Sequence, residues 1–301
     1  MNRTLAFSLS AALFVLPATA KNKPAPDPAA AQDPGKGINL YSMEQEIALG
    51  RQMSQDVELQ SRLCDDAVVN EYINRLGQNI GRNAGAQFPL TIKVLESDEV
   101  NAFALPGGYL YVNTGLVMNA ENEAELAGVL AHEIAHVAAR HGTKQATRGQ
   151  LIQYATLPLI FFGGSAGILI YEAATLAAPL EYSHFSRGME LQADKLGLEY
   201  IYKSGYDPAA FVDFFEKLQS QQKKEPNVFA RAFSSHPMNN SRIRHAQTVI
   251  QSEFQPEPQY LLDTSEFHSI RDRLEAARKR REAYRSYAQP ALKTRPGAPW
   301  Q

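Results

Sequence analysis

The chain has 301 residues, of which 44% are hydrophobic, so it is long enough to build one large domain with a substantial core. Its 30 Lys and Arg residues nearly balance 32 Asp and Glu residues, and the net charge of −2 gives no reason to expect nucleic-acid binding. The single cysteine, Cys64, excludes an internal disulfide, so stability must come from packing and from any bound metal.

The first 20 residues have the layout of a secretory signal peptide. Arg3 supplies a positive charge, residues 5–16 are mostly apolar, and Ala18-Thr19-Ala20 fits an A-x-A cleavage site. The apolar part is short for a membrane span, and no Cys follows the cleavage site for lipid attachment. We expect export to the periplasm and a mature chain that starts near Lys21. An uncleaved anchor is the alternative.

Residues 21–37 are rich in Pro and Ala and lack an apolar period, which is typical of a disordered linker. A capping-box pattern at Ser42 and Gln45 predicts the start of a helix, and apolar residues at helical spacing predict a second one. Alternation predicts two strands, with a Pro-Gly-Gly turn ahead of the second. In chain order, these elements are helices over 42–60 and 67–79 and strands over 90–95 and 109–117.

The stretch 120–141 is rich in strong helix formers and contains the run His132-Glu133-Ile134-Ala135-His136. Two histidines four residues apart share one face of a helix, about one turn apart. Their rings can therefore bind one zinc ion, while Glu133 lies beside the metal and can take a proton from its bound water. The alternative is a pair of partly exposed histidines beside a solvated glutamate.

A catalytic zinc needs a third protein ligand besides two histidines and a water. The pattern HExxHxxGxxH fails here, because position 139 is Ala and His141 misses the register by one. A carboxylate on a later helix remains, and the candidates are Glu172, Glu181 and Glu190. Glu190 is favoured because Asp194 lies on the same helical face, where it could accept the free N–H of a ligand histidine.

Further helices are expected over 189–204, 208–221 and 265–287. The last is amphipathic, and its basic run 278–281 is more typical of a solvated face than of a binding patch. Residues 151–171 are apolar, uncharged and long enough to span a bilayer, but they contain Gln153, Pro158 and two glycines. We expect an insertion near the site or a surface that touches a membrane or a membrane partner. A transmembrane span is the alternative.

Four blocks in order resemble the M48 metallopeptidases. They are residues 101–108 (NAFALPGG), 132–136 (HEIAH), 186–194 (SRGMELQAD) and 235–243 (SHPMNNSRI). The resemblance covers roughly residues 41–250 and implies a gluzincin fold, which is α+β and mainly helical with a small β-sheet beside the HExxH helix. It implies one zinc ion per subunit held by His132, His136 and Glu190, with Glu133 as general base and acid and Asp194 beside the ligands. Another divalent metal stays open.

The fourth block contributes His236 and Arg242, which are candidates to stabilise the oxyanion of the reaction. His236 could instead occupy the open position on zinc and keep a protease latent, or simply pack in a turn. Asn101, Ala102, Phe103 and Ala104 precede the motif helix, where gluzincins carry an edge strand to which an unfolded polypeptide can add. The remaining histidines, which we expect to be structural or exposed, are His141, His184, His245 and His268.

The sequence thus predicts a signal peptide at 1–20, a linker at 21–37, a zinc metallopeptidase domain at 38–250 and a helical extension at 251–301. It looks like a short form, without tetratricopeptide repeats, of the periplasmic BepA- and LoiP-like quality-control proteases. We expect an endopeptidase for misfolded exported or outer-membrane proteins, with unfolded polypeptides and envelope assembly proteins as partners. The alternative is an assembly or chaperone-like binding factor with latent or incidental proteolysis, but an intact Glu133 favours the enzyme.

Overall fold

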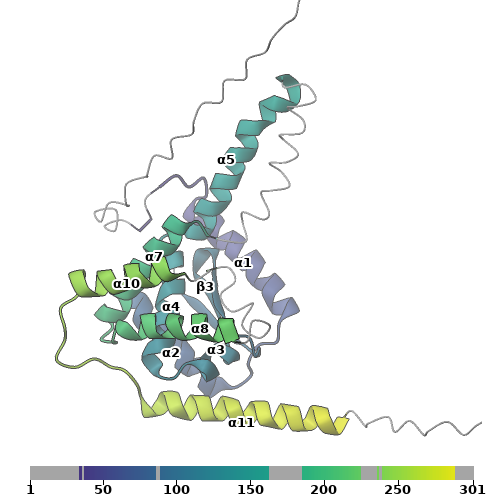
Figure 1. Cartoon of the computed structure of the whole chain (residues 1–301). Coiled ribbons are helices and arrows are strands. Elements are labelled where there is room, and N and C mark those ends of the chain that lie inside the picture. Colours follow the sequence, from purple (N-terminus) through teal and green to yellow (C-terminus); the bar gives the residue numbers. More distant parts are fainter. Residues whose placement is uncertain are drawn as a thin grey trace, which may run out of the picture.

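The computed structural model describes residues 34–35, 37–85, 89–162, 185–224, 236 and 239–288. Over these residues the protein is mainly helical with one three-stranded sheet, which confirms the expected α+β class. In Figure 1 the helices gather around the sheet, and α5 projects away from the rest of the described chain. The expected signal peptide and most of the expected linker lie outside the described residues.

The predicted elements occur in the expected order. The first part of the chain contains α1 (Met43–Gln60), α2 (Ala67–Asn83), β1 (Thr91–Leu95), β2 (Ala102–Leu105), a short 3-10 turn η2 (Pro106–Gly108) and β3 (Tyr109–Asn113). The second part contains α3 (Thr114–Asn119), α4 (Glu123–Ala138), α5 (His141–Phe162), α7 (Arg187–Lys203), α8 (Ala209–Lys224), α10 (Asn240–Glu253) and α11 (Ser265–Ala288). The bounds of α1, α2, β1, α7, α8 and α11 agree with the predictions to within a few residues; α3, α5 and α10 were not predicted.

The sheet has the order β1-β3-β2, with β1 parallel and β2 antiparallel to β3. The amide of Asn113 donates to the carbonyl of Asn101 at 3.0 Å. Because hydrogen-bonded pairs alternate along an antiparallel ladder, the backbone groups of Ala102 and Ala104 point away from β3. Among the described residues no strand pairs with that side of β2, so β2 offers a free edge where an edge strand was expected.

The predicted strand over 109–117 is wrong beyond Asn113, where the chain turns into α3. The cause is a contact with the loop after β1. The hydroxyl of Thr114 donates to the Ser97 carbonyl at 2.9 Å, and the amide of Gly115 donates to the same oxygen at 2.7 Å. A Cβ on Gly115 would lie 2.4 Å from the carbonyl oxygen of Asp98, so only glycine permits this approach.

The motif helix also ends earlier than its composition suggests, at Ala138. Arg140 adopts a left-handed conformation with φ 55°, and α5 begins at the next residue. Its guanidinium donates from Nε to the buried carboxylate of Glu46 at 2.6 Å and from Nη2 to the Tyr41 carbonyl at 2.8 Å. This ion pair between α1 and the corner holds a turn that is costly for a residue with a side chain.

Helix α4 forms the centre of the core, and every residue along it is buried. It contacts α7, α2, α8 and β2. The approach of α7 is close, because a Cβ on Gly197 would lie 3.1 Å from the backbone nitrogen of His132. The motif helix is therefore fixed on several sides before any side chain of the site is considered.

The C-terminal part of the described chain is anchored to the first turn of α4. The buried carboxylate of Glu123 accepts hydrogen bonds from the hydroxyls of Tyr72 at 2.8 Å and Tyr206 at 2.6 Å, and also from Thr264. Thr264 lies directly before α11, which runs as the expected amphipathic helix along the lower side in Figure 1. The extension therefore packs on the same core as the motif.

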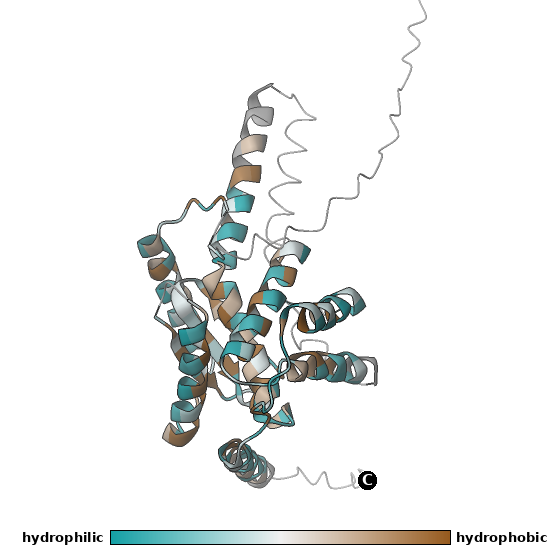
Figure 2. Cartoon of the chain, turned by 90° about the vertical axis from the view of Figure 1, so that its left-hand side faces the viewer, coloured by the Kyte–Doolittle hydropathy of each residue, from teal (hydrophilic) through white to brown (hydrophobic). Residues whose placement is uncertain are grey.

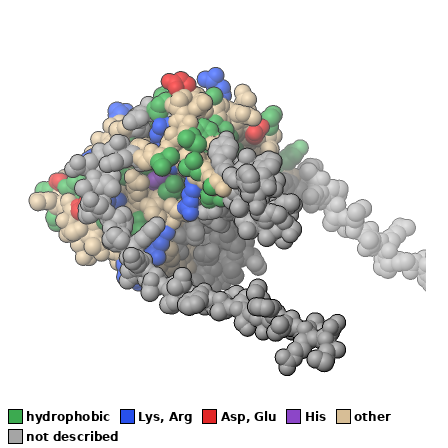
Figure 3. Space-filling model, turned by 90° about the horizontal axis from the view of Figure 1, so that it is seen from above, with side chains coloured by type: hydrophobic (Ala, Val, Ile, Leu, Met, Phe, Trp, Pro, Cys, Tyr) green, Lys and Arg blue, Asp and Glu red, His purple; other side chains and the backbone are tan. Residues whose placement is uncertain are grey.

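Helix α5 contains the first half of the apolar segment 151–171, and residues 163–171 lie outside the described part. None of the described helices combines the length and apolar character needed to cross a membrane. Leu151 and Ile152 have 41% and 37% of their surfaces exposed, beside the exposed Arg148. Figure 2 shows brown apolar residues on this projecting helix, and Figure 3 shows apolar and basic side chains together on this end of the molecule.

One close contact between α1 and the turn after β2 can be tested directly. A Cβ on Gly50 would lie 1.8 Å from the carbonyl oxygen of Pro106. We expect Gly50→Ala to lower the free energy of unfolding by about 1–3 kcal/mol, because α1 must move off the turn. Gly188→Ala is the matched control, since its Cβ would meet nothing within 4 Å. Equal stability of the two variants in denaturant titrations would contradict this packing.

Candidate metal centre

The two motif histidines lie side by side on α4 and are buried. Their Nε2 atoms are 3.2 Å apart. Two nitrogens bound to one tetrahedral zinc ion are about 3.3 Å apart, given a metal–nitrogen distance of about 2.05 Å. The helix therefore presents His132 and His136 at a separation that suits a shared metal.

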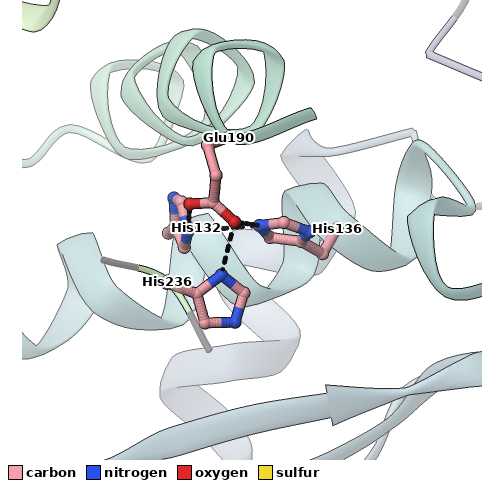
Figure 4. A group of neighbouring side chains, drawn as sticks. All are labelled: His132, His136, Glu190 and His236. Atoms are coloured by element: carbon pink, nitrogen blue, oxygen red, sulfur yellow. Dashed lines mark hydrogen bonds and ion pairs between the residues drawn. The ribbon is translucent and has the colours of Figure 1, made fainter. Parts of the chain in front are cut away.

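Glu190 comes to these histidines from the first turn of α7, which Ser186 caps. Its carboxylate oxygens each lie 3.6 Å from one Nε2 atom, Oε2 from that of His132 and Oε1 from that of His136. His236 approaches the same carboxylate, with Nδ1 2.8 Å from Oε1 of Glu190. Figure 4 shows the three rings around the carboxylate, and one ligand atom from each of the four residues lies within 4.8 Å of the others.

The donor set suits a divalent cation. Imidazole nitrogens and carboxylate oxygens are the ligands that zinc takes besides thiolates. Nδ1 of His132 lies 3.2 Å from Oδ1 of Asp194, which can accept its proton and leave Nε2 with a lone pair. The Nε2 atoms of His132 and His136 face each other, and a cation bound between them would take the place of any proton there.

Arg242 on α10 contacts both carboxylates of α7, those of Glu190 and Asp194. It donates from Nε and Nη2 to Asp194 at 2.8 and 2.6 Å, and its Nη1 lies 2.7 Å from Oε2 of Glu190. All three residues are buried. Burial opposes ionisation of Asp194, but the hydrogen bonds from Arg242 and His132 outweigh it and keep the pKa of this carboxyl below its ordinary value.

Glu133 lies in a different environment, although it is equally buried. Its Oε2 accepts a hydrogen bond from the amide of Ala104 at 3.2 Å, and its Oε1 lies 3.7 Å from Nε2 of His236. No arginine is bonded to it in the described chain, and burial raises the pKa of this carboxyl above its ordinary value. The raised pKa makes Glu133 a stronger proton acceptor than an ordinary carboxylate.

The pKa values of the two ligand histidines are shifted in opposite directions. Burial and the neighbouring rings lower the pKa of His136 well below its ordinary value, so this ring is neutral and can offer a lone pair. Burial also opposes a charge on His132, but hydrogen bonds to Asp194 and Glu190 outweigh it and raise the pKa of His132 to about 9. Metal binding to His132 would therefore release a proton.

The structure brings together the residues that the sequence singled out as ligands, base and supporting groups. These are His132, Glu133, His136, Glu190, Asp194, His236 and Arg242, and the edge-strand residue Ala104 reaches Glu133. Asn101, Ala102 and Phe103 lie along or next to the same free edge. The other carboxylate candidates, Glu172 and Glu181, lie outside the described residues.

Two residues near the metal centre were not expected there. His141 is buried, with Nδ1 3.0 Å from Nδ1 of His136, although it has no ligand register. Phe185 packs its ring 4.3 Å from the ring of His136 and 5.3 Å from that of His236. Nothing in the sequence marks Phe185, because the segment before a helix carries no periodicity. His141 stands out in the sequence because it follows His136 by five residues, but its position beside His136 depends on the left-handed turn at Arg140.

Comparison with known proteins points to one family. The model of peptidase family M48 matches residues 67–250. The beta-barrel assembly-enhancing protease of Yersinia pestis is 31% identical over 232 residues, which cover 72% of this chain and 46% of that protein. Metalloprotease LoiP of Escherichia coli K12 is 30% identical over 62% of this chain and 74% of that protein. The mitochondrial metalloendopeptidase OMA1 of Schizosaccharomyces pombe is 30% identical over 65% of this chain and 56% of that protein.

The chain spans about half the length of the beta-barrel assembly-enhancing proteases that it matches. The family match nevertheless covers more than half of this chain and includes the whole buried cluster. A metallopeptidase family implies a catalytic metal, and His132, His136, Glu190 and His236 are the described residues that could bind it. The chain therefore belongs to peptidase family M48.

Proposed function

We propose that this protein is a zinc endopeptidase that hydrolyses peptide bonds of unfolded or misassembled proteins of the bacterial envelope. The observation that carries the proposal is the position of Glu133, a buried carboxylate with a raised pKa between the donor cluster and the free edge of β2. A binding protein has no use for such a group. The names of the relatives, which include a beta-barrel assembly-enhancing protease, support the choice of envelope proteins as clients.

In this proposal His132, His136 and Glu190 hold the zinc ion. The bound ion would supply a Lewis acid that makes a water molecule acidic near neutral pH. Glu133 takes a proton from that water during attack on the peptide carbonyl and then gives it to the leaving amine. Asp194 keeps the ring of His132 oriented, and Arg242 contacts both carboxylates of α7 and keeps Asp194 ionised.

The substrate would add to β2 as an extended strand. The outward carbonyl of Ala104 can accept from a main chain, and its amide can donate to one when it leaves Glu133; such pairing needs little sequence specificity. The bond from Ala104 to Glu133 places that edge directly beside the proton acceptor. A peptide that pairs with β2 would therefore present its carbonyl groups near the donor cluster, which suits unfolded clients.

His236 fits a resting state of the enzyme. Its buried ring lies against Glu190 and within the set of atoms that could bind one ion. We propose that in the resting enzyme His236 would bind the zinc ion together with the other three residues and would give up this place to a substrate. Arg242 fits the oxyanion role less well, because its donor groups are already directed at Asp194, Glu190 and the carbonyl of His236.

The proposed setting is the periplasm, reached through the signal at 1–20. The relatives named for beta-barrel assembly favour outer-membrane assembly proteins among the partners. The exposed Leu151 and Ile152 on α5 favour a peripheral contact with a membrane or a membrane protein through 151–171. The expected domain division, with the peptidase domain at 38–250 and the extension at 251–301, belongs to the same proposal.

Replacing the proposed base tests the enzyme directly. Glu133→Gln keeps the size of the side chain but cannot take a proton, so cleavage of an unfolded test protein should fall by at least about 10²–10⁴-fold. Zinc content should stay that of the wild type, because Glu133 is not one of the proposed ligands. The exposed Glu71→Gln is the matched control. Equal cleavage by Glu133→Gln would exclude the proposed mechanism, and zinc binding without any cleavage would favour the assembly-factor alternative.

The role of the free edge is tested by Ala104→Pro. Proline removes the amide that reaches Glu133 without removing a bond to β3, because that amide points outward. We expect kcat/KM for an unfolded test protein to fall about 10–100-fold, as for a lost hydrogen bond to a charged group. Ala104→Gly, which keeps the amide, should stay close to wild type. The edge has no such role if both variants cleave at the same rate.

His236→Ala distinguishes two roles of His236, a ligand that keeps the enzyme latent (a latch) and a donor that stabilises the oxyanion. Loss of a latch worth about 1.4 kcal/mol should raise resting proteolysis about tenfold. Loss of an oxyanion donor should instead lower the rate by about 10²–10³-fold. The rate of cleavage of an unfolded test protein, with His245→Ala as control, measures which holds. A rate of cleavage by His236→Ala equal to that of the wild type would rule out both roles.

A further inference from the structure

His141 lies beside the metal centre and has no part in the mechanism proposed above. Only 1% of its surface is exposed. Its Nδ1 lies 3.0 Å from Nδ1 of His136, and its Nε2 lies 3.1 Å from Oε1 of Gln192. Gln192 belongs to α7, two residues after Glu190. The ring of His141 therefore connects a histidine of α4 to the helix that carries Glu190.

These contacts determine where the protons lie. Oε1 of Gln192 can only accept, so Nε2 of His141 carries a proton and donates it. In a neutral imidazole, a proton on Nε2 leaves the other nitrogen, here Nδ1 of His141, with a lone pair. Nδ1 of His136 must then be the donor in the contact between the rings. A neutral His136 with a proton on Nδ1 has its lone pair on Nε2, the atom that faces His132.

The fold places His141 there by breaking the helix. In an unbroken helix, a residue five positions after His136 would lie roughly 140° around the axis from it. The left-handed conformation of Arg140 ends α4 and starts α5 at His141, so that the ring returns to the side of α4 that carries the ligands. The ion pair of Arg140 with the buried Glu46 holds this corner. A residue of α1 thus supports the placement of the ring.

We propose that His141, anchored by Gln192, is a positioning residue that fixes the tautomer and the ring orientation of His136 for metal binding. The inference rests on the proposed function in one respect, namely that the cluster binds a divalent cation. His132 has a charged acceptor, Asp194, whereas His136 has this neutral one. The two histidines are therefore held by partners of different charge, and loss of either partner should weaken the site.

The test uses zinc binding by the full mature chain, measured by competition with a chromophoric chelator. His141→Phe keeps a ring in the buried space but removes both nitrogens. We expect its zinc affinity to fall about 10–100-fold. His141→Asn should recover most of this loss, because its Oδ1 can stand where Nδ1 accepts the proton of His136. Gln192→Leu, which frees the ring of His141, should lose less than His141→Phe.

The control His245→Phe replaces a histidine outside the cluster and should bind zinc as the wild type does. Thermal unfolding of each metal-free variant and the Co²⁺ absorption spectrum separate a positioning effect from general instability. Wild-type affinity in His141→Phe would overturn the inference, and so would equal losses in His141→Phe and His141→Asn. A wild-type protein that binds no zinc would overturn the proposed function as well, so the two failures are distinguishable.

Discussion

The metal centre depends on how closely α7 packs against α4. A Cβ on Gly197 would lie 3.1 Å from the backbone nitrogen of His132, so the two helices touch nearly backbone to backbone at the first ligand. This contact brings Glu190 and Asp194 to a motif that precedes them by more than fifty residues. Since α4 is buried along its whole length, α7 has a rigid surface to pack against.

Close packing buries the charged groups of the site, and the pKa of each carboxyl depends on the partners that contact it. Desolvating an ion costs several kcal/mol unless a partner and hydrogen bonds offset it. Arg242 and His132 offset this cost for Asp194, and His132 and His236 offset it for Glu190, so the pKa values of both carboxyls lie below the ordinary range. Glu133 has only the amide of Ala104 and the more distant ring of His236, and its pKa is raised. One buried cluster thus contains two carboxyls with lowered pKa values and one with a raised pKa.

The free edge of β2 links this chemistry to the surface of the sheet. The same amide of Ala104 that points away from β3 is the one that reaches Glu133. In the proposed mechanism, a single hydrogen bond therefore separates the edge that would pair with a substrate from the proton acceptor Glu133. A small sheet is sufficient, because α4 and α1 both contact β2 and hold it in place.

The sequence by itself determined what depends on local periodicity. The spacing of His132 and His136 places both rings on one face of any helix, and the same holds for Glu190 and Asp194. Most helices followed from the same kind of pattern, whereas the fold class was implied by the resemblance of four sequence blocks to a known family. An apolar period also predicted β3, but it could not show where that strand stops.

Tertiary structure decided where elements end and which distant groups meet. The strand stops at Asn113 because Thr114 and Gly115 bond to Ser97, and the motif helix stops because Arg140 pairs with Glu46. Each of these partners lies far away in the sequence, so no local pattern contains the information. The place of His141 beside His136 follows from the second of these contacts. Local spacing thus predicted which side chains could bind a metal, whereas contacts between distant segments decided what surrounds them.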